Sequence, residues 1–198
     1  MMNDARTASL TRTTRETDIS LSLRLDAAAP QVEVDTGIGF FDHMLTALAF
    51  YGRMDLRCTA RGDLHVDGHH TVEDVGIVLG RALAQALGDK RGVRRFADVR
   101  VPMDEALCEC TLDLSGRPYL VFLADMPQPM IGAYDSCLTV EFMRALAMNA
   151  GLTLHLRCAY GSNAHHITEG LFKALGLALR QAATVEDGGV TSTKGALE

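Results

Sequence analysis

An internal repeat constrains the fold of this chain more than any other feature of its sequence. The motif His-His-x-x-Glu occurs twice, at residues 69–73 and 165–169. Residues 43–48 match 141–146, and 55–58 match 155–158, at the same separation of roughly 100 residues. We therefore expect one domain, residues 1–198, built of two similar halves (about 10–93 and 94–184) and followed by a C-terminal tail (185–198).

Hydrophobic periodicity predicts an α+β fold, with each half a sheet backed by two helices around a shared core. Alternation of apolar and polar residues predicts strands in residues 18–26, 53–67, 95–104, 106–115, 117–125 and 152–160. Helical spacing predicts helices in residues 41–52, 69–88, 140–151 and 165–183.

Composition excludes several function classes. The 198 residues are 47% hydrophobic and 22% charged, with a net charge of −6, so there is no excess of Lys and Arg for nucleic acid or an anionic membrane. Neither a transmembrane run nor a signal-peptide core is visible, which favours the cytoplasm. The five cysteines lack Cys-x-x-Cys spacing, and most are expected to fill core space, with Cys108 and Cys110 on one face of a strand.

The histidines are clustered in the sequence. Five of the seven lie at one single position and in the two pairs that open predicted helices: His43, His69, His70, His165 and His166. In each helix a Glu, Glu73 or Glu169, follows the two histidines by four and three residues, so all three side chains can converge on one side. Imidazoles with carboxylates suit zinc, manganese, iron or nickel, and the absence of thiolates disfavours a structural zinc site.

Adjacent histidines on a helix point roughly 100° apart, which makes it difficult for both to bind the same ion. Two ions are the natural solution. The alternative is that His and Glu only cap and solvate two helix starts. Duplication of the motif, together with His43 upstream, favours the metal interpretation.

Four segments resemble the signature blocks of the imidazoleglycerol-phosphate dehydratase family: GIGFFDHML, HVDGHHTVEDVGIVLG, RFADVRVPMDEAL and GSNAHHITEGLFKALGLALRQA. The closing TSTKG resembles that family's last block, and the match runs from about residue 15 to 195. The resemblance implies a duplicated fold of the ribosomal protein S5 domain 2-like type. It also implies self-association into 24 copies, with active sites at subunit interfaces.

The resemblance implies two manganese ions (Mn²⁺) per active site. The ligands of the first would be His43, His70, His165 and Glu169. The ligands of the second would be His69, Glu73, His166 and residue 141. The family usually has His at that position, where this chain has Glu141. Either Glu141 replaces it as a carboxylate ligand, or the local register differs and one ligand is lost; the repeat, which pairs Glu141 with His43, favours replacement.

The implied reaction removes water from D-erythro-imidazoleglycerol phosphate to give imidazole acetol phosphate, a step of histidine biosynthesis. The substrate imidazole would bind between the two cations as imidazolate. Glu16 matches the family's substrate-contacting and acid/base glutamate, so the resemblance implies both roles for it; without the resemblance it would be an exposed Glu at a strand edge. Asp104 and Glu105 form a second carboxylate pair, for which structural turn roles are equally compatible, so they are left out of the site.

The substrate itself would be a small phosphorylated imidazole. The implied imidazole-side contacts are Glu16, His43, His69, Glu73 and His165. The implied phosphate-binding residues are Arg95, Arg117, Lys173, Ser192, Thr193 and Lys194, whose cations and hydroxyls suit a phosphate. Taken singly, each basic residue would be interpreted as a surface charge.

Two other functions use the same ligands. A two-metal hydrolase would activate water on a phosphoester. A metal-storage or di-iron protein would place them in a long four-helix bundle, which the several strand-like runs of this chain disfavour.

Overall fold

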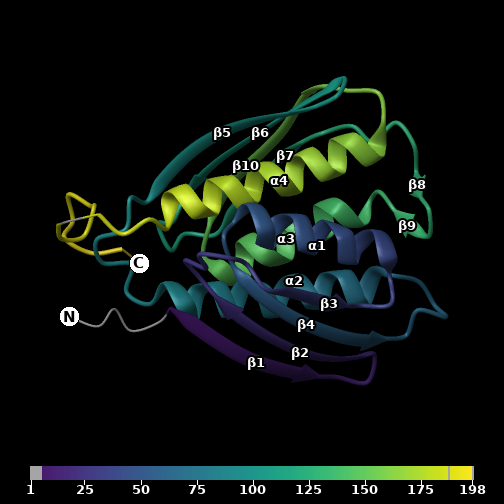
Figure 1. Cartoon of the computed structure of the whole chain (residues 1–198), viewed down its shortest axis with the longest axis horizontal. Coiled ribbons are helices and arrows are strands. Elements are labelled where there is room, and N and C mark those ends of the chain that lie inside the picture. Colours follow the sequence, from purple (N-terminus) through teal and green to yellow (C-terminus); the bar gives the residue numbers. More distant parts are fainter. Residues whose placement is uncertain (1–5, 187, 198) are drawn as a thin grey trace.

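The computed structural model describes residues 6–186 and 188–197 of the chain (Figure 1). The first five residues and residues 187 and 198 of the predicted tail therefore lie outside the described part. The strands are β1 (Thr7–Thr13), β2 (Thr17–Arg24), β3 (Val32–Asp35), β4 (Asp55–Gly62), β5 (Phe96–Met103), β6 (Ala106–Asp113), β7 (Tyr119–Leu123), β8 (Met130–Ile131), β9 (Tyr134–Asp135) and β10 (Thr153–Tyr160). The helices are α1 (Gly39–Tyr51), α2 (His69–Leu87), α3 (Leu138–Ala150) and α4 (Ala164–Ala182).

Two four-stranded sheets share one topology. Their orders are β1-β2-β4-β3 and β5-β6-β10-β7, so each element of the first sheet has a counterpart in the second. In both sheets the first three strands are antiparallel, and the last strand pairs parallel to its neighbour. The repeat in the sequence is thus a repeat of the fold, as predicted. A separate two-stranded hairpin, β8-β9, precedes α3.

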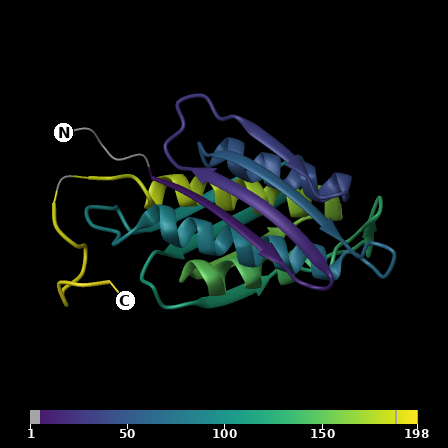
Figure 2. The same ribbon diagram turned by 90° about the horizontal axis from the view of Figure 1, so that it is seen from below.

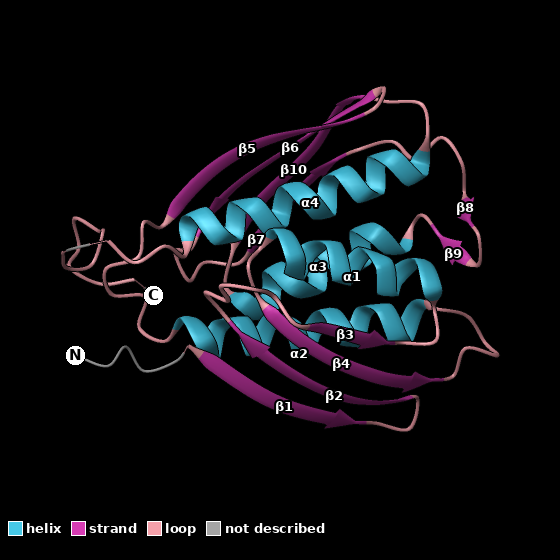
Figure 3. Cartoon of the chain, viewed as in Figure 1, coloured by secondary structure: helices cyan, strands magenta, loops and turns pink. Residues whose placement is uncertain are grey.

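The helices lie between the two sheets (Figures 1 and 3). Helices α1 and α2 cover the first sheet, α3 and α4 cover the second, and the two layers meet where α2 packs on α3 and α1 on α4. Seen from the side of the first sheet, its strands cross the helices obliquely (Figure 2). One continuous set of buried apolar side chains fills the space between the sheets.

Equivalent glycines bring the helix layers close together. A Cβ at Gly176 of α4 would lie 2.5 Å from the carbonyl oxygen of Leu48 in α1. A Cβ at Gly80 of α2 would lie 2.8 Å from the carbonyl oxygen of Leu146 in α3. Because Gly80 and Gly176, like Leu48 and Leu146, are repeat partners, the same backbone contact is built twice.

Most predicted elements are confirmed, and the differences have local causes. Cys108 and Cys110 are both fully buried on one face of β6, as expected. The strand predicted for residues 53–67 was too long: β4 ends at Gly62, and the N–H of Val66 closes a turn onto the carbonyl of Asp63 at 2.7 Å. Strands β1, β3, β8 and β9 were missed, since they bury few side chains. Among the described residues, no helix has the length and apolar character needed to cross a membrane.

Candidate active site

The starts of the four helices gather at one end of the molecule. A Cβ at Gly68, just before α2, would lie 3.1 Å from a methyl of Ile38, just before α1, and 3.2 Å from a methyl of Leu138 at the start of α3. The rings of His43 in α1 and His165 in α4 are 6.3 Å apart. The two histidine pairs, at the first residues of α2 and α4, therefore lie at this end, which is the right-hand end of Figure 1.

Each histidine pair begins its helix behind a short polar side chain. The N–H of His69 donates to Oδ1 of Asp67 at 2.7 Å, and that of His165 donates to Oδ1 of Asn163 at 2.9 Å. These side chains satisfy backbone donors that a helix start leaves without partners. The local sequence thus fixes where each of these two helices begins.

Three predicted ligands from α1 and α4 form one compact cluster. Nε2 of His165 lies 3.2 Å from Oε2 of Glu169, and Nε2 of His43 lies 3.6 Å from the same oxygen. Ligand atoms of all three groups lie within 4.8 Å of one another. Glu169 is 8% exposed in its side chain, whereas both imidazoles reach solvent. Two nitrogens and one carboxylate facing open space are suited to a divalent transition metal that keeps further positions for other ligands.

The carboxylate of the cluster is held ionised. Burial alone would raise the pKa of Glu169, but Lys173, one helical turn further on, holds that pKa below its usual value together with His43 and His165. Nζ of Lys173 donates to Oε1 of Glu169 at 2.8 Å, so Oε2 remains directed at the histidines. Because ligands must be deprotonated, this arrangement prepares Glu169 to bind a cation.

The equivalent positions of α2 and α3 are more open. Nε2 of His69 lies 3.8 Å from Oε2 of Glu73, and both side chains are exposed. Glu141 in α3 instead accepts from the guanidinium of Arg144, one turn later. Within residues 6–186 and 188–197, no third ligand group completes a cluster around His69 and Glu73. The role of Glu141 as a ligand stays a prediction.

The second histidine of each pair faces a different set of carboxylates. Nδ1 of His70 lies 3.0 Å from Asp63, and its Nε2 lies 3.9 Å from Glu16. The hydrogen bond to Asp63 is the main cause of a raised pKa of His70. Within one chain, His70 does not join the cluster of His43, His165 and Glu169, with which the resemblance grouped it.

His166 is placed in the same way in the other half. Its Nδ1 lies 2.7 Å from Glu105, and its Nε2 lies 3.7 Å from Asp104. This hydrogen bond raises the pKa of His166 and, with backbone donors of the loop before α4, lowers the pKa of Glu105 to about 2. The sequence left Asp104 and Glu105 out of the site because turn roles suited them equally well, and Asp63 carries no local signal that links it to His70.

Predicted phosphate-binding residues gather at the opposite end of the molecule. A hollow of about 410 Å³ is lined by the following residues: Arg95, Arg117, Thr191, Ser192, Thr193, Lys194, Ala196 and Leu197. Arg95 donates to both carboxylate oxygens of Asp113, at 2.7 and 3.0 Å, and to the carbonyl of Thr191 at 2.7 Å. The tail is thereby held against the second sheet, with cations and hydroxyls around one hollow suited to a phosphate.

Lys173 is not part of this hollow, since it is paired with Glu169 near the histidines. The N–H of Arg95 donates to the carbonyl of Ala182, so the hollow lies beside the last residue of α4, whereas the histidine cluster lies at its first turn. At a rise of 1.5 Å per residue, the 13 residues from Glu169 to Ala182 separate the two groups by about 20 Å along α4. Figure 1 shows the tail and the hairpin β8-β9 at opposite ends of this helix.

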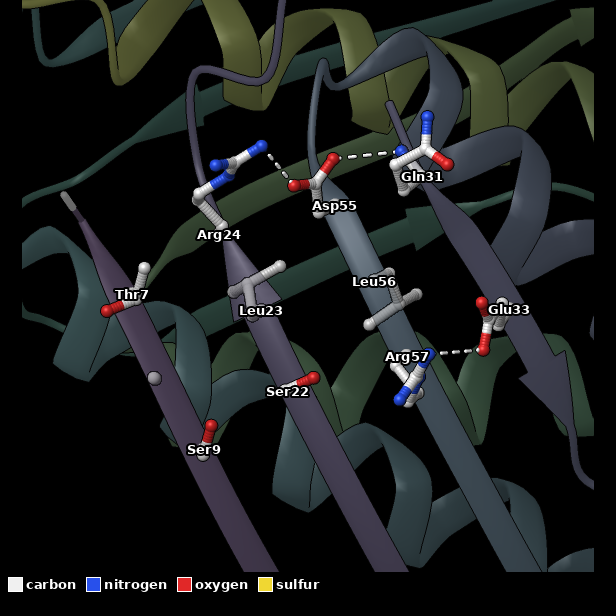
Figure 4. A pocket seen from close by; sticks show the side chains of 11 residues that line it. Thr7, Ser9, Ser22, Leu23, Arg24, Gln31, Glu33, Asp55, Leu56 and Arg57 are labelled. Atoms are coloured by element: carbon white, nitrogen blue, oxygen red, sulfur yellow. Dashed lines mark hydrogen bonds and ion pairs between the residues drawn. The ribbon is translucent and has the colours of Figure 1, made fainter. Parts of the chain in front are cut away.

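Another hollow, of about 330 Å³, lies on the outer face of the first sheet and includes no predicted site residue (Figure 4). Its charged side chains are already paired: Arg24 with Asp55 at 2.5 Å and Arg57 with Glu33 at 2.8 Å. It is a groove between paired surface charges. We do not assign it to the active site.

Fold and site together define an internally duplicated α+β protein with a histidine–carboxylate cluster suited to a divalent metal. Comparison with known proteins identifies the family. The family model described as imidazoleglycerol-phosphate dehydratase matches residues 36–179. The chain belongs to this family, which makes it a hydro-lyase of histidine biosynthesis.

Relatives and solved structures of the same name match nearly the whole chain. The imidazoleglycerol-phosphate dehydratase of Gluconobacter oxydans is 56% identical over 199 residues, covering 99% of this chain and 100% of the relative. That of Streptococcus mutans is 57% identical over 194 residues, covering 97% and 100%. The crystal structure of the Staphylococcus aureus enzyme gives a TM-score of 0.82 at 38% identity over 90% of this chain and 99% of that one. The Pyrococcus furiosus enzyme in complex with (S)-C348 gives 0.83 at 40% identity over 95% and 100%.

Proposed function

We propose that this chain dehydrates D-erythro-1-(imidazol-4-yl)glycerol 3-phosphate to 3-(imidazol-4-yl)-2-oxopropyl phosphate in the cytoplasm, using two manganese ions per active site. The observation that carries the proposal is the cluster of His43, His165 and Glu169, together with the repeat partners of these residues on α2 and α3. Nitrogen and carboxylate donors without thiolates fit manganese. The proposed first set adds His70 to this cluster, and the second consists of His69, Glu73, His166 and Glu141.

The chemical difficulty is that the hydrogen lost from the substrate carbon is not acidic. Bound divalent ions would supply Lewis acidity toward the substrate imidazole, which makes the neighbouring hydroxyl easier to expel. The chain's own part is to orient the imidazole between the two ligand sets and to move the protons. His43, His69 and His165 would surround the ring, with Glu73 beside it.

Glu16 is our candidate for the proton-transfer group. It lies in the turn between β1 and β2, its side chain is about half exposed, and its Oε2 is 3.9 Å from Nε2 of His70. A carboxylate beside a ligand histidine can take the proton from the substrate carbon and return one to the departing hydroxyl. The backbone supports this position, since the carbonyl of Glu16 accepts from the N–H of Asp63 at 3.1 Å.

The phosphate would bind in the hollow at the other end of the fold. Arg95 and Arg117 would contribute charge there, and Ser192, Thr193 and Lys194 would close over it from the tail. Lys173 would act at the imidazole end, because it already contacts Glu169.

A complete site would require more than one copy of the chain. An imidazole, a three-carbon chain and a phosphate, joined by bonds of about 1.5 Å, cannot span the length of α4. The separation of the metal cluster from the phosphate hollow therefore supports sites shared between subunits, within the assembly of 24 copies that we propose.

Mixed assemblies test the shared site. A chain carrying Glu169→Gln and a chain carrying Arg95→Ala are each expected to be inactive. Co-assembly of the two should restore part of the turnover, because some sites then combine an intact metal end with an intact phosphate end. Mixed assemblies without any turnover would contradict the shared site.

The dehydration itself is tested with purified, chelator-stripped protein and the imidazole substrate, with and without added manganese. We expect manganese-dependent formation of the ketone, followed by the absorbance of its enol. Protein that binds two metal ions per chain but releases phosphate instead of ketone would overturn the proposal in favour of a two-metal hydrolase.

A further inference from the structure

The second histidine of each pair is oriented through Nδ1 by a carboxylate outside the predicted ligand sets. Nδ1 of His70 lies 3.0 and 3.2 Å from the two oxygens of Asp63, and Nδ1 of His166 lies 2.7 Å from Oε2 of Glu105. An ionised carboxylate can only accept a hydrogen bond, so in both pairs the imidazole Nδ1 is the donor. A neutral imidazole protonated at Nδ1 carries its lone pair on Nε2.

Duplication alone does not explain this arrangement, because the two carboxylates occupy different places in the repeat. Asp63 is the residue directly after β4, and the residue directly after its counterpart β10 is Gly161. Glu105 lies in the turn between β5 and β6, and the acid in the equivalent turn, Glu16, faces Nε2 of His70 rather than Nδ1. Two different elements thus supply the same carboxylate contact to Nδ1, which indicates that both histidines require it.

Glu105 is itself firmly held. Its Oε1 accepts from the N–H of Asn163 at 2.8 Å and from the N–H of Ser162 at 3.1 Å, while Oε2 faces His166. One carboxylate therefore joins the β5-β6 turn to the loop before α4 and orients the histidine. Asp63 is anchored by its backbone N–H on Glu16, and its side chain is 18% exposed.

The Nε2 atoms of both histidines are directed toward exposed groups at the same end of the molecule. The carboxylates opposite them, Glu16 and Asp104, lie 3.9 and 3.7 Å away, and their side chains are 55% and 79% exposed. The side chains of His70 and His166 are themselves 33% and 25% exposed. Each can reach a ligand supplied from outside the chain's own cluster.

We propose that Asp63 and Glu105 are positioning residues that hold His70 and His166 in the Nδ1-protonated form and present Nε2 to a metal ion at a site completed by another copy of the chain. This inference rests on the metal-binding role proposed above. In metal sites, a partner on the second ring nitrogen sets tautomer and ring orientation, and its loss weakens metal binding about 10- to 100-fold.

The amide variants Glu105→Gln and Asp63→Asn test the proposal. In Glu105→Gln the amide oxygen can still accept from the loop before α4, but the amide N–H₂ faces Nδ1 and favours the opposite tautomer. We expect an about 10- to 100-fold loss of manganese affinity, measured by electron paramagnetic resonance titration. Histidine ¹⁵N spectra of the metal-free protein should show the proton of His166 moving from Nδ1 to Nε2.

Conservative and control variants separate positioning from folding. Glu105→Asp should retain the Nδ1-protonated form and bind manganese more tightly than Glu105→Gln does. Glu109→Gln is the matched control, because Glu109 lies on β6 and pairs with Arg100 and Arg157 rather than with a histidine. Its manganese affinity should equal that of the wild type. If Glu105→Gln fails to fold by circular dichroism, Asp63→Asn carries the same test in the other half.

The outcomes distinguish this inference from the proposed function. Wild-type protein that binds no manganese would overturn both. If the wild type binds manganese and both amide variants keep its affinity and its histidine tautomers, only the positioning role of Asp63 and Glu105 is overturned.

Discussion

Two pairs of helices that the repeat relates, α1 with α4 and α2 with α3, differ in how far their ligand groups are assembled. On α1 and α4, a buried Glu169 held by Lys173 faces His43 and His165. On α2 and α3, the repeat partner of Glu169 is the exposed Glu73, and the repeat partner of His43 is Glu141. A duplicated fold therefore carries one preorganised cluster and one open one.

Single substitutions between the repeats explain the difference. The residue one turn after Glu73 is Ile77, where the residue one turn after Glu169 is Lys173, so Glu73 has no cation there to fix it. Conversely, Glu141 is followed by Arg144, which takes its carboxylate. Because a carboxylate that is already paired must exchange partners before it ligates, we expect the α2–α3 set to bind its ion more weakly.

Removal of the buried carboxylate should have the largest effect. Glu169→Gln takes the charged ligand from the preorganised cluster and leaves Lys173 without its partner. We expect loss of one bound metal ion, counted by elemental analysis, and loss of measurable turnover. Glu73→Gln, the repeat partner, should also lose turnover but lower the melting temperature less, since Glu73 is exposed; equal destabilisation by both would contradict the comparison.

Glu16→Gln should reduce turnover about 10²- to 10⁴-fold, the usual contribution of a general acid or base. Glu16 is not among the ligands of either set, so the metal content should remain that of the wild type. A variant that loses metal together with turnover would show instead that Glu16 acts on the ligands.

The open set is probed at position 141. Glu141→His places the same residue at position 141 as at its repeat partner, position 43. This variant should retain activity and bind manganese at least as tightly as the wild type. Removal of a group that only orients a ligand lowers metal affinity roughly 10- to 100-fold. Glu141→Ala removes a ligand itself, so it should weaken the binding of one ion by at least that factor. Titration of each variant with manganese measures this. Wild-type affinity in Glu141→Ala would show that the position does not ligate.

The smallest effects concern the helix contact that both halves share. Gly176→Ala should destabilise the fold by about 1–3 kcal/mol, the usual cost of overpacking, because its Cβ would lie 2.5 Å from the carbonyl oxygen of Leu48. Gly80→Ala, with 2.8 Å to Leu146, should cost less. Denaturant unfolding measures both, with Gly39→Ala as the control, since its Cβ would meet nothing within 4 Å.

The strands and helices with strong burial patterns could be predicted from the sequence. Strand β6 buries alternate residues, and α4 buries a long apolar stripe. By contrast, β1 buries only Ala8 and β3 buries no side chain fully, so their sequences resemble those of loops. Pairing with a neighbouring strand, rather than hydrophobic burial, defines these edge elements.

For the site, short-range spacing could be predicted and long-range pairing could not. The contact between His165 and Glu169 follows from their separation of four residues on one helix. The hydrogen bond between His166 and Glu105 joins residues 61 positions apart and depends on where the β5-β6 turn ends in space. No local pattern encodes that distance. The separation of the phosphate hollow from the histidines likewise emerges only from the three-dimensional fold.

The central claim is that the helix starts hold two metal ions on two unequal ligand sets. An anomalous-scattering map from crystals of the manganese-loaded protein tests it most directly. We predict two manganese peaks per chain, the stronger within about 2.0–2.3 Å of ligand atoms of His43, His165 and Glu169 and the weaker beside His69 and Glu73. A map whose manganese peaks avoid these residues, or a single peak elsewhere on the fold, would contradict it.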